Sequence, residues 1–364
     1  MTGTSLGSPV RHTHHASPVH EPPAAIRATG IIVVLTIVLA ILAIAFALPA
    51  ARSKPHDVPI GAAGPQAASG QVADILEQQA PGAFAITYYP GEAALRDAIR
   101  NRDVYGGISF GAGADVAGQA APERRSLLIA TGGSPMVAQM LTQIGNGIAQ
   151  QAGVPLHTED LAPPTTDDPR GAGVAASALP ITLAGLLPAV ALVMLSPASG
   201  AGPSLRGEYP HKREVWTRFT AAVVFAAVGG TTIAALLRYV LGSIDQNVWG
   251  VAAGLTLGLL AAGLSMLGLG SLFGRAGLAI GALLALLLGN PLSGLNSAPQ
   301  MLPSGWGTLG QWLPQGATAT LLRSTAFFDG AGATTAIAVL TCWAVAGTTL
   351  IVFAAVRQGR SVPA

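Results

Sequence analysis

Charge is scarce in this chain, and several kinds of reactive residue are scarcer still. Only 10% of its 364 residues are charged, whereas a soluble domain usually has about 25%. The single cysteine, Cys342, has no intrachain partner for a disulfide and makes no metal site by itself. The net charge of +2 is too small to indicate nucleic-acid binding, and no basic stripe with interleaved aromatic residues is present.

A nucleotide-binding loop and a catalytic triad are also missing. The chain has two lysines, Lys54 and Lys212, and neither follows a glycine, so no G-x-x-x-x-G-K-[ST] loop exists. Within residues 50–176 His56 and His157 are the only histidines, so no Ser/His/Asp set can be assembled there. We therefore expect no enzyme activity, no cofactor, and no catalytic, cofactor-binding or metal-binding residues; ATP, if used, is bound by another subunit.

Long apolar runs are what the chain does contain. Ile31–Leu48 is 18 residues without a charge, and roughly 20 apolar residues are enough for a helix to cross a bilayer. Five more runs follow in the second half: about Ala178–Leu195, Phe219–Leu241, Val248–Leu272, Gly277–Gly289 and Ala333–Val356. The pattern predicts an α-helical polytopic membrane protein with about six transmembrane helices. The Gly277–Gly289 run is short, so a half-span or a re-entrant hairpin stays open for it.

The N-terminus precedes the first span. Residues 1–26 are rich in Pro, His, Ser and Thr and predict a disordered cytoplasmic tail. His12, His14 and His15 form an H-x-H-H cluster there, which we interpret as solvated because no carboxylate or cysteine lies nearby to complete a metal site. The first helix, 27–49, is longer than the apolar region of a secretory signal, so we interpret it as an uncleaved anchor.

Lysine and arginine near the spans predict the orientation. With a cytoplasmic N-terminus, nine basic residues flank the spans inside and five flank them outside. The inside set is Arg11, Arg27, Arg206, Lys212, Arg213, Arg218, Arg275, Arg357 and Arg360, and the outside set is Arg52, Lys54, Arg170, Arg238 and Arg323. We therefore expect both termini in the cytoplasm, with a short C-terminal tail at 358–364.

Residues 50–176 predict an extracytoplasmic α/β domain inserted between the first two helices. Strand signals over Phe84–Tyr89, Val104–Phe110 and Arg125–Ala130 alternate with helical spacing over Gln71–Gln79, Glu92–Arg102 and Ser134–Gln151, and a short apolar run covers Val58–Ala62. Pro155–Arg170 predicts an extended acidic linker back to the membrane.

Two features of this domain have both a functional and a structural interpretation. Thr131–Ser134 could present amides to an anion, but we favour a plain turn in which Ser134 caps a helix and Pro135 occupies its first position. The carboxylates of the linker could attract a cation, but we favour a solvated linker because prolines separate them; they are Glu159, Asp160, Asp167 and Asp168.

Residues 177–357 predict a five-helix transmembrane domain, with a cytoplasmic loop over 199–216 and an outer re-entrant segment over 290–332. Small residues recur every four positions at Gly250, Gly254, Gly258 and Ala262, which predicts close helix packing. A sliding or dimer seam that moves during transport is the alternative. No Asp, Glu or His lies at mid-membrane, which argues against an ion-coupled carrier.

This plan resembles the type-2 ABC exporter permeases, especially the Pip/YhgE (phage infection protein) membrane proteins. The segments that carry the resemblance are FALPAARSKPHDVPIGAAGP at Phe46–Pro65, EAALRDAIRNRDVYGGISF at Glu92–Phe110, and the proline-containing Gly289–Gly330. Such a permease pairs as a homodimer or with a second permease in the lipid bilayer of the bacterial cytoplasmic membrane. It exports hydrophobic or amphipathic substrates and is powered by a separate ABC ATPase.

The resemblance also implies which residues contact the ATPase. They lie in the loop before the third helix and are Arg206, Glu208, Lys212, Arg213 and Glu214. The alternative function is a non-transporting scaffold or receptor, whose outer domain binds a partner protein as a secretion-system accessory or phage receptor does.

Overall fold

The structure is a computed structural model that describes residues 24–114, 120–153, 155–194, 210–295 and 297–360. The chain divides into two compact units, Met1–Ile44 and Ala45–Ala364. Within the first unit only α1 (Ala24–Ala51) is described, and it continues into the start of the second. The helix begins at Ala24, inside the segment 1–26 for which we predicted disorder; residues 1–23, with the H-x-H-H cluster, lie outside the described residues.

Five helices of the described residues are long and apolar enough to cross a membrane, judged by length and composition. They are Ala28–Leu48, Ala172–Met194, Val215–Val240, Val248–Gly289 and Thr334–Arg357. The prediction of a largely helical chain with several candidate membrane spans and an α/β region is thus confirmed. The count differs from the predicted six because two predicted helices fall within Val248–Gly289.

The long segment Val248–Gly289 is folded back on itself at Gly274. It consists of α8 (Val248–Leu284) and the π-helical turn η3 (Ala285–Gly289), and Gly274 interrupts α8 with φ 58° and ψ −135°. A Cβ placed on Gly281 would lie 2.3 Å from Met266 Sδ, so the two arms run antiparallel. The second arm, residues 275–289, is about 22 Å long at 1.5 Å per residue, which is less than the ~30 Å hydrocarbon core.

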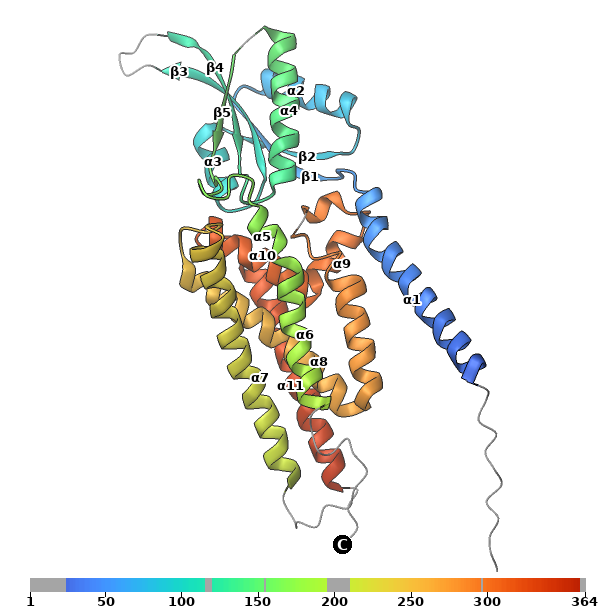
Figure 1. The fold of residues 1–364 in the computed structure, drawn as a ribbon. Coiled ribbons are helices and arrows are strands. Elements are labelled where there is room, and N and C mark those ends of the chain that lie inside the picture. The colour runs from blue at the N-terminus through green and yellow to red at the C-terminus, as the bar shows by residue number, and fades with distance from the viewer. Residues whose placement is uncertain (1–23, 115–119, 154, 195–209, 296, 361–364) are drawn as a thin grey trace, which may run out of the picture. The chain divides into compact units, whose positions relative to one another are not determined.

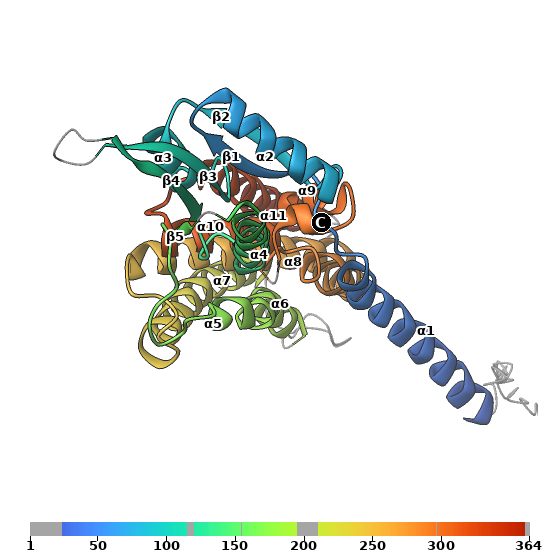
Figure 2. The ribbon, with the colours of Figure 1, turned by 90° about the horizontal axis from the view of Figure 1, so that it is seen from above.

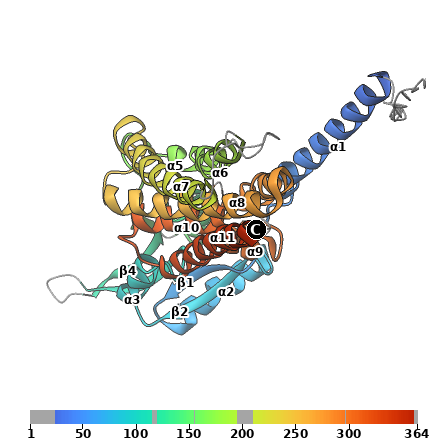
Figure 3. The same ribbon diagram turned by 90° about the horizontal axis from the view of Figure 1, so that it is seen from below.

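The first arm of α8 is the centre of the helix bundle. It packs against four other helices of the second unit (Figure 3). The helices around it are α6 (Ala178–Met194), α7 (Pro210–Ala235), which the π-helical η2 (Leu236–Val240) extends, α10 (Pro314–Phe327) and α11 (Thr334–Arg360). Leu237, Leu255, Leu322 and Leu340 are fully buried among them.

Two predicted boundaries of the bundle are wrong. The loop expected over 199–216 ends earlier, because α7 begins at Pro210 and already includes Lys212–Glu214. The tail expected over 358–364 is helical as far as Arg360. In both places the helix extends beyond its apolar run, since charged residues such as Lys, Arg and Glu are good helix formers.

The outer segment 290–332 contains three short helices between the bundle and the α/β domain (Figure 1). They are η4 (Pro299–Met301), α9 (Trp306–Trp312) and α10, which has Pro314 at its first position. Twelve residues of α10 are buried. A helix that is buried almost all round is part of a core rather than a surface connection.

The α/β domain is a five-stranded sheet in the order β2-β1-β3-β4-β5. Strand β1 pairs in parallel with β2 and β3, and β4 runs antiparallel to β3 and parallel to β5. The strands are β1 (Val58–Ala63), β2 (Phe84–Tyr89), β3 (Gly106–Ala114), β4 (Ala120–Ile129) and β5 (Leu156–Asp160), and the helices are α2 (Gln66–Gln79), α3 (Glu92–Arg100) and α4 (Pro135–Ala152). The short α5 (Ala172–Ala176) follows the domain and begins the candidate span that continues through α6. The predicted strands and helices between residues 71 and 151 are confirmed.

Helices cover both faces of this sheet. Val72 of α2 and Leu141 of α4 pack on one face, and Leu95 and Ile99 of α3 pack on the other (Figure 2). The ends of α4 follow the sequence closely: Ser134 Oγ accepts a hydrogen bond from Val137 N at 3.4 Å. Gly153 ends the helix in the left-handed conformation with φ 65°, where glycine costs least.

The acidic linker predicted over Pro155–Arg170 is partly wrong, because its first residues form β5. Arg96 joins this strand to α3: its Nη1 donates to Glu159 Oε1 at 2.6 Å, and its Nη2 donates to Glu92 Oε1 at 2.7 Å. The charge of Glu159 is therefore paired within the domain instead of solvated in a linker.

Acid is expected to weaken the domain through this ion pair. The hydrogen bond from Arg96 holds the pKa of Glu159 below its ordinary value of 4.5. The carboxylate therefore stabilises the fold above that value, and the stabilisation is lost as the pH falls through the lower folded-state pKa. Because both side chains are partly exposed, we expect only about 0.5 kcal/mol. Thermal unfolding of the protein across the acid range measures this loss of stability.

Glu159→Gln should remove the pH-dependent contribution of the ion pair, whereas the control Asp74→Asn, at an exposed position, should keep it. If both variants lose stability in acid to the same extent, the assignment to Glu159 is contradicted.

Close packing of α8 against α11 predicts a sharp contrast between two glycines. A Cβ on Gly347 would lie 2.4 Å from the backbone carbon of Leu264, whereas a Cβ on Gly263 meets nothing nearer than 3.6 Å. Gly347→Ala should therefore destabilise the bundle by about 1–3 kcal/mol, and Gly263→Ala should be neutral or mildly stabilising. Thermal unfolding of both variants in the same detergent is the measurement. Equal melting temperatures would show that this interface is looser than described.

Candidate functional site

The α/β domain is attached to the outer segment by backbone hydrogen bonds. Lys54 N donates to Met301 O and His56 N donates to Gln300 O, each at 3.1 Å. Ser53 Oγ donates to Met301 O at 2.8 Å, and Tyr105 OH donates to Gln300 Oε1 at 3.1 Å. The approach to β1 therefore runs along the η4 helix, more than 240 residues away in the sequence.

Apolar side chains continue across the same junction. Ala298 and Met301 are buried in the core that α2 and α4 form on the sheet. Phe327 and Phe328, at the end of α10, pack against the core on the α3 side. Because the outer segment contributes to both cores, the domain and the bundle share one hydrophobic interior at this point.

Arg102 joins the α/β domain to α10 through its side chain. Its Nη1 donates to Thr320 O at 3.1 Å and to Ser324 Oγ, both on α10. Its guanidinium carbon lies 5.2 Å from the centre of the Phe328 ring, a cation–π distance. Burial lowers the pKa of Arg102 and raises that of the neighbouring Tyr105.

Arg323, on α10, is buried more deeply still, with 6% of its surface exposed. Its Nη1 donates to Gly294 O and its Nη2 to Leu295 O, each at 2.7 Å. Burial lowers its pKa to about 10, so the side chain stays protonated at neutral pH. The ion pairs given by the described residues involve neither Arg102 nor Arg323.

A cavity of about 120 Å³ lies beside Arg323. We call it the junction cavity. Its walls come from the turn before α4, the linker that leads into α5, and α10. Among its lining residues are Thr131, Gly132, Arg170, Ala172 and Arg323.

A second cavity, of about 110 Å³, lies inside the helix bundle. We call it the bundle cavity. Most of its wall is apolar and comes from α6, both arms of α8, and α11. Three polar side chains line it, Thr182, Ser265 and Gln315. Gln315 is 8% exposed and sits in the first turn of α10.

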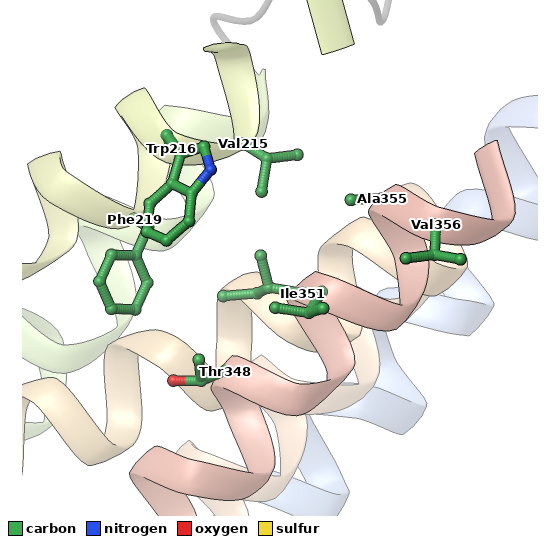
Figure 4. A pocket seen from close by; sticks show the side chains of 8 residues that line it. Val215, Trp216, Phe219, Thr348, Ile351, Ala355 and Val356 are labelled. Carbon is green, nitrogen blue, oxygen red and sulfur yellow. The ribbon is translucent and has the colours of Figure 1, made fainter. Parts of the chain in front are cut away.

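A third cavity, about 440 Å³, is an apolar groove between the start of α7 and the last part of α11 (Figure 4). Its α7 side consists of Val215, Trp216 and Phe219, whose two rings meet edge to face with centroids 5.9 Å apart. Its α11 side is lined by Thr348, Ile351, Val352, Ala355 and Val356. Groove volume and apolar lining suit a hydrophobic chain or helix.

The predicted ATPase-contact residues fall next to this groove in the sequence. Lys212, Arg213 and Glu214 lie in the first turns of α7, directly before Val215. Arg206 and Glu208 lie outside the described residues. The structure thus places a charged helix start, not a loop, beside an apolar groove.

The small-residue row on α8 has more than one partner. A Cβ on Gly258 would lie 2.2 Å from Thr318 Oγ1, and one on Gly254 would lie 3.0 Å from Leu321 Cγ, so both glycines face α10. Ala262 instead faces Gly185 of α6, and Gly250 faces Asn247, which caps its own helix. The row therefore serves helix contacts within this chain.

The acidic residues of the predicted linker do not converge. Asp160 Oδ1 accepts hydrogen bonds from Thr131 N and Ala162 N at 3.1 Å, and Asp168 accepts from Ala172 N and Gly173 N at 2.8 Å. These carboxylates fix turns. Among the described residues no group of three or more His, Cys, Asp or Glu is arranged to hold a metal ion.

Sequence reasoning missed Arg102, Arg323 and the cavities. Arg323 was counted only as a basic residue flanking a span. A usable signal was present, because an arginine among apolar and small residues in LLRSTAFF is costly to bury without partners. The identity of those partners depends on the fold.

Comparisons with models of known families, with curated proteins and with solved structures find no match. We therefore infer the function from the geometry of the junction, the cavities and the groove.

Removing the Arg102 side chain is expected to loosen the junction. Arg102→Ala leaves two acceptors on α10 without their donor and should cost about 1.5–3 kcal/mol, whereas the exposed Arg100→Ala should change stability by less than about 0.5 kcal/mol. Thermal unfolding gives the stability, and hydrogen exchange should rise in α10 for Arg102→Ala alone. Unchanged exchange in α10 would mean that Arg102 does not hold the junction.

Proposed function

We propose that the protein is the permease subunit of an ATP-driven exporter that moves a hydrophobic or amphipathic substrate out of the cell. In this proposal a separate ABC ATPase provides the energy, and the subunit works as a homodimer or beside a second permease. The observation that carries the proposal is a bundle of candidate membrane helices that encloses a mostly apolar cavity with three polar side chains on its wall.

The proposed location is the bacterial cytoplasmic membrane, with both termini in the cytoplasm. The excess of Lys and Arg near the inner ends of the spans supports this orientation. Within the second unit, the end of α6, the start of α7 and the end of α11 lie at the end of the bundle away from the α/β domain (Figure 1). The proposal makes that end cytoplasmic and the α/β domain extracytoplasmic.

The proposed ATPase contact is at the start of α7. Lys212, Arg213 and Glu214 offer charges of both signs, and the groove beside them offers about 440 Å³ of apolar space. An apolar groove of this kind is typical of a protein interface. The absence of a nucleotide-binding loop from the sequence requires that ATP be bound elsewhere.

The proposed substrate path passes the bundle cavity. Its apolar wall fits the apolar part of an amphipathic substrate, and Gln315 with Thr182 and Ser265 offers hydrogen bonds to a polar part. Helices α6, α8 and α10 meet there, and small residues such as Gly185 and Gly281 keep the backbones close.

One observation favours the alternative, a scaffold or receptor that transports nothing. The bundle cavity measures about 110 Å³, whereas sites for drug-sized ligands usually exceed about 300 Å³. Strand β2 is also an edge strand that leaves Tyr88 55% exposed. Edge strands with exposed aromatic side chains are suited to pairing with another chain.

Purification of the full chain in mild detergent tests the proposal. An ATPase should co-purify, and neutralising Lys212, Arg213 and Glu214 together to Gln should reduce its recovery by at least about tenfold, a loss of about 1.4 kcal/mol. Gln315→Leu should keep the ATPase bound but weaken its stimulation by an amphipathic substrate. Arg275→Gln is the control for a charge elsewhere on the bundle.

A different pattern would support the alternative. There, the co-purified partner has no ATPase activity, its recovery falls in Tyr88→Ala, and the charge-neutralised α7 variant retains it. If an ATPase co-purifies and its recovery is unchanged in both the α7 variant and Tyr88→Ala, the assigned contact is contradicted.

A further inference from the structure

Two guanidinium groups of the junction, on the half-buried Arg102 and the buried Arg323, take part in none of the described ion pairs. Arg102 bonds to Thr320 and Ser324 of α10, and Ser324 directly follows Arg323 in that helix. The hydrogen bonds of both groups go to neutral oxygens, which are the Thr320, Gly294 and Leu295 carbonyls and the Ser324 hydroxyl. Carbonyl oxygens satisfy the N–H donors, but they do not neutralise the charge. A buried charge that is not neutralised costs several kcal/mol.

The carboxylates near this place are already occupied. Asp160 and Asp168 bond backbone amides of residues at the cavity wall, and the ion pairs of the described residues include neither arginine of the junction. No described hydrogen bond or ion pair joins a carboxylate to Arg323, so its guanidinium group can still attract an anion.

The junction cavity provides the space for that group. Arg323, 94% buried, lines it from α10, and the exposed Arg170 lines it from the linker before α5. About 120 Å³ is room for a small tetrahedral or planar anion but not for a drug-sized molecule. Planar guanidinium groups bind phosphate and carboxylate oxygens through paired N–H donors.

The position of the cavity relative to the candidate spans suggests where the anion comes from. Ala172, which lines the cavity, is also the first residue of the candidate span Ala172–Met194. The end of a membrane-spanning helix lies at the depth of lipid headgroups, where cationic side chains meet lipid phosphates.

We propose that the junction cavity between Arg170 and Arg323 binds a phosphate-class anion, either the headgroup of an anionic phospholipid or free phosphate. The bound anion compensates the charge of Arg323 and joins the α/β domain to the bundle, because the cavity wall comes from both. This site is separate from the bundle cavity, and it exists whether the protein exports a substrate or not.

The test is the thermal unfolding of the full chain in a neutral detergent, with three additions compared. Phosphatidylglycerol should raise the melting temperature by about 3 °C or more, and phosphatidylcholine should not. Inorganic phosphate distinguishes the two sources: a similar rise identifies a free anion, and no rise identifies a lipid headgroup.

Variants locate the effect. Arg323→Gln should abolish the rise, and Arg170→Gln, at an exposed position that should not affect folding, should weaken the apparent affinity by about tenfold. Arg275→Gln, an exposed arginine at the hairpin turn that does not line the cavity, should keep the full rise. If Arg323→Gln does not fold, the rise in melting temperature is compared between Arg170→Gln and Arg275→Gln. A weaker apparent affinity in Arg170→Gln alone then supports the site. No rise with either additive, or an equal rise in all variants, overturns the proposal.

Discussion

Burial of α10 is the constraint on which the second unit depends. This helix of 14 residues is surrounded by α8, α11 and α6, and its far end enters the core of the α/β domain. It can be buried so completely only because glycines on α8 leave space for its side chains. Thr318 packs against Gly258, and Leu321 packs against Gly254. Several of its buried polar side chains donate to carbonyl oxygens: Arg323 to those of Gly294 and Leu295, and Thr318 and Thr325 to carbonyls of their own helix. The domain and the bundle are thus built around one shared helix.

The hairpin of α8 solves a different problem. The first arm of α8 packs against α6, α7, α10 and α11 and lines part of the bundle cavity, and a second stretch of α8 can line another part of it only if the chain turns back. Gly274 provides the turn, because its backbone conformation is one that residues with a Cβ rarely adopt. The second arm then places small residues against the first and completes the cavity wall.

Much of this architecture could be predicted from sequence, for identifiable reasons. The apolar runs are long, and the elements of the α/β domain are short and bounded by clear signals such as Ser134-Pro135 before α4. Strand β5 could not be predicted, because LHTED has one apolar residue and becomes a strand only by pairing with β4.

The start of α7 could not be predicted from hydropathy. An apolar run indicates where a helix crosses the membrane, whereas the helix itself continues through charged residues. The partners of Arg102 and Arg323 depend on contacts between distant segments, which no local pattern contains. Nothing tests the predicted loop contact with an ATPase, so that remains a prediction.

The position of α10 has a mechanical consequence. Its first turn carries Gln315 at the bundle cavity, and its later turns carry Thr320 and Ser324, which are bonded to Arg102 of the α/β domain. Ser324 follows Gln315 by nine residues, which is about 14 Å along the helix axis. A displacement of the domain that moved α10 along this axis would therefore also move Gln315 at the wall of the bundle cavity.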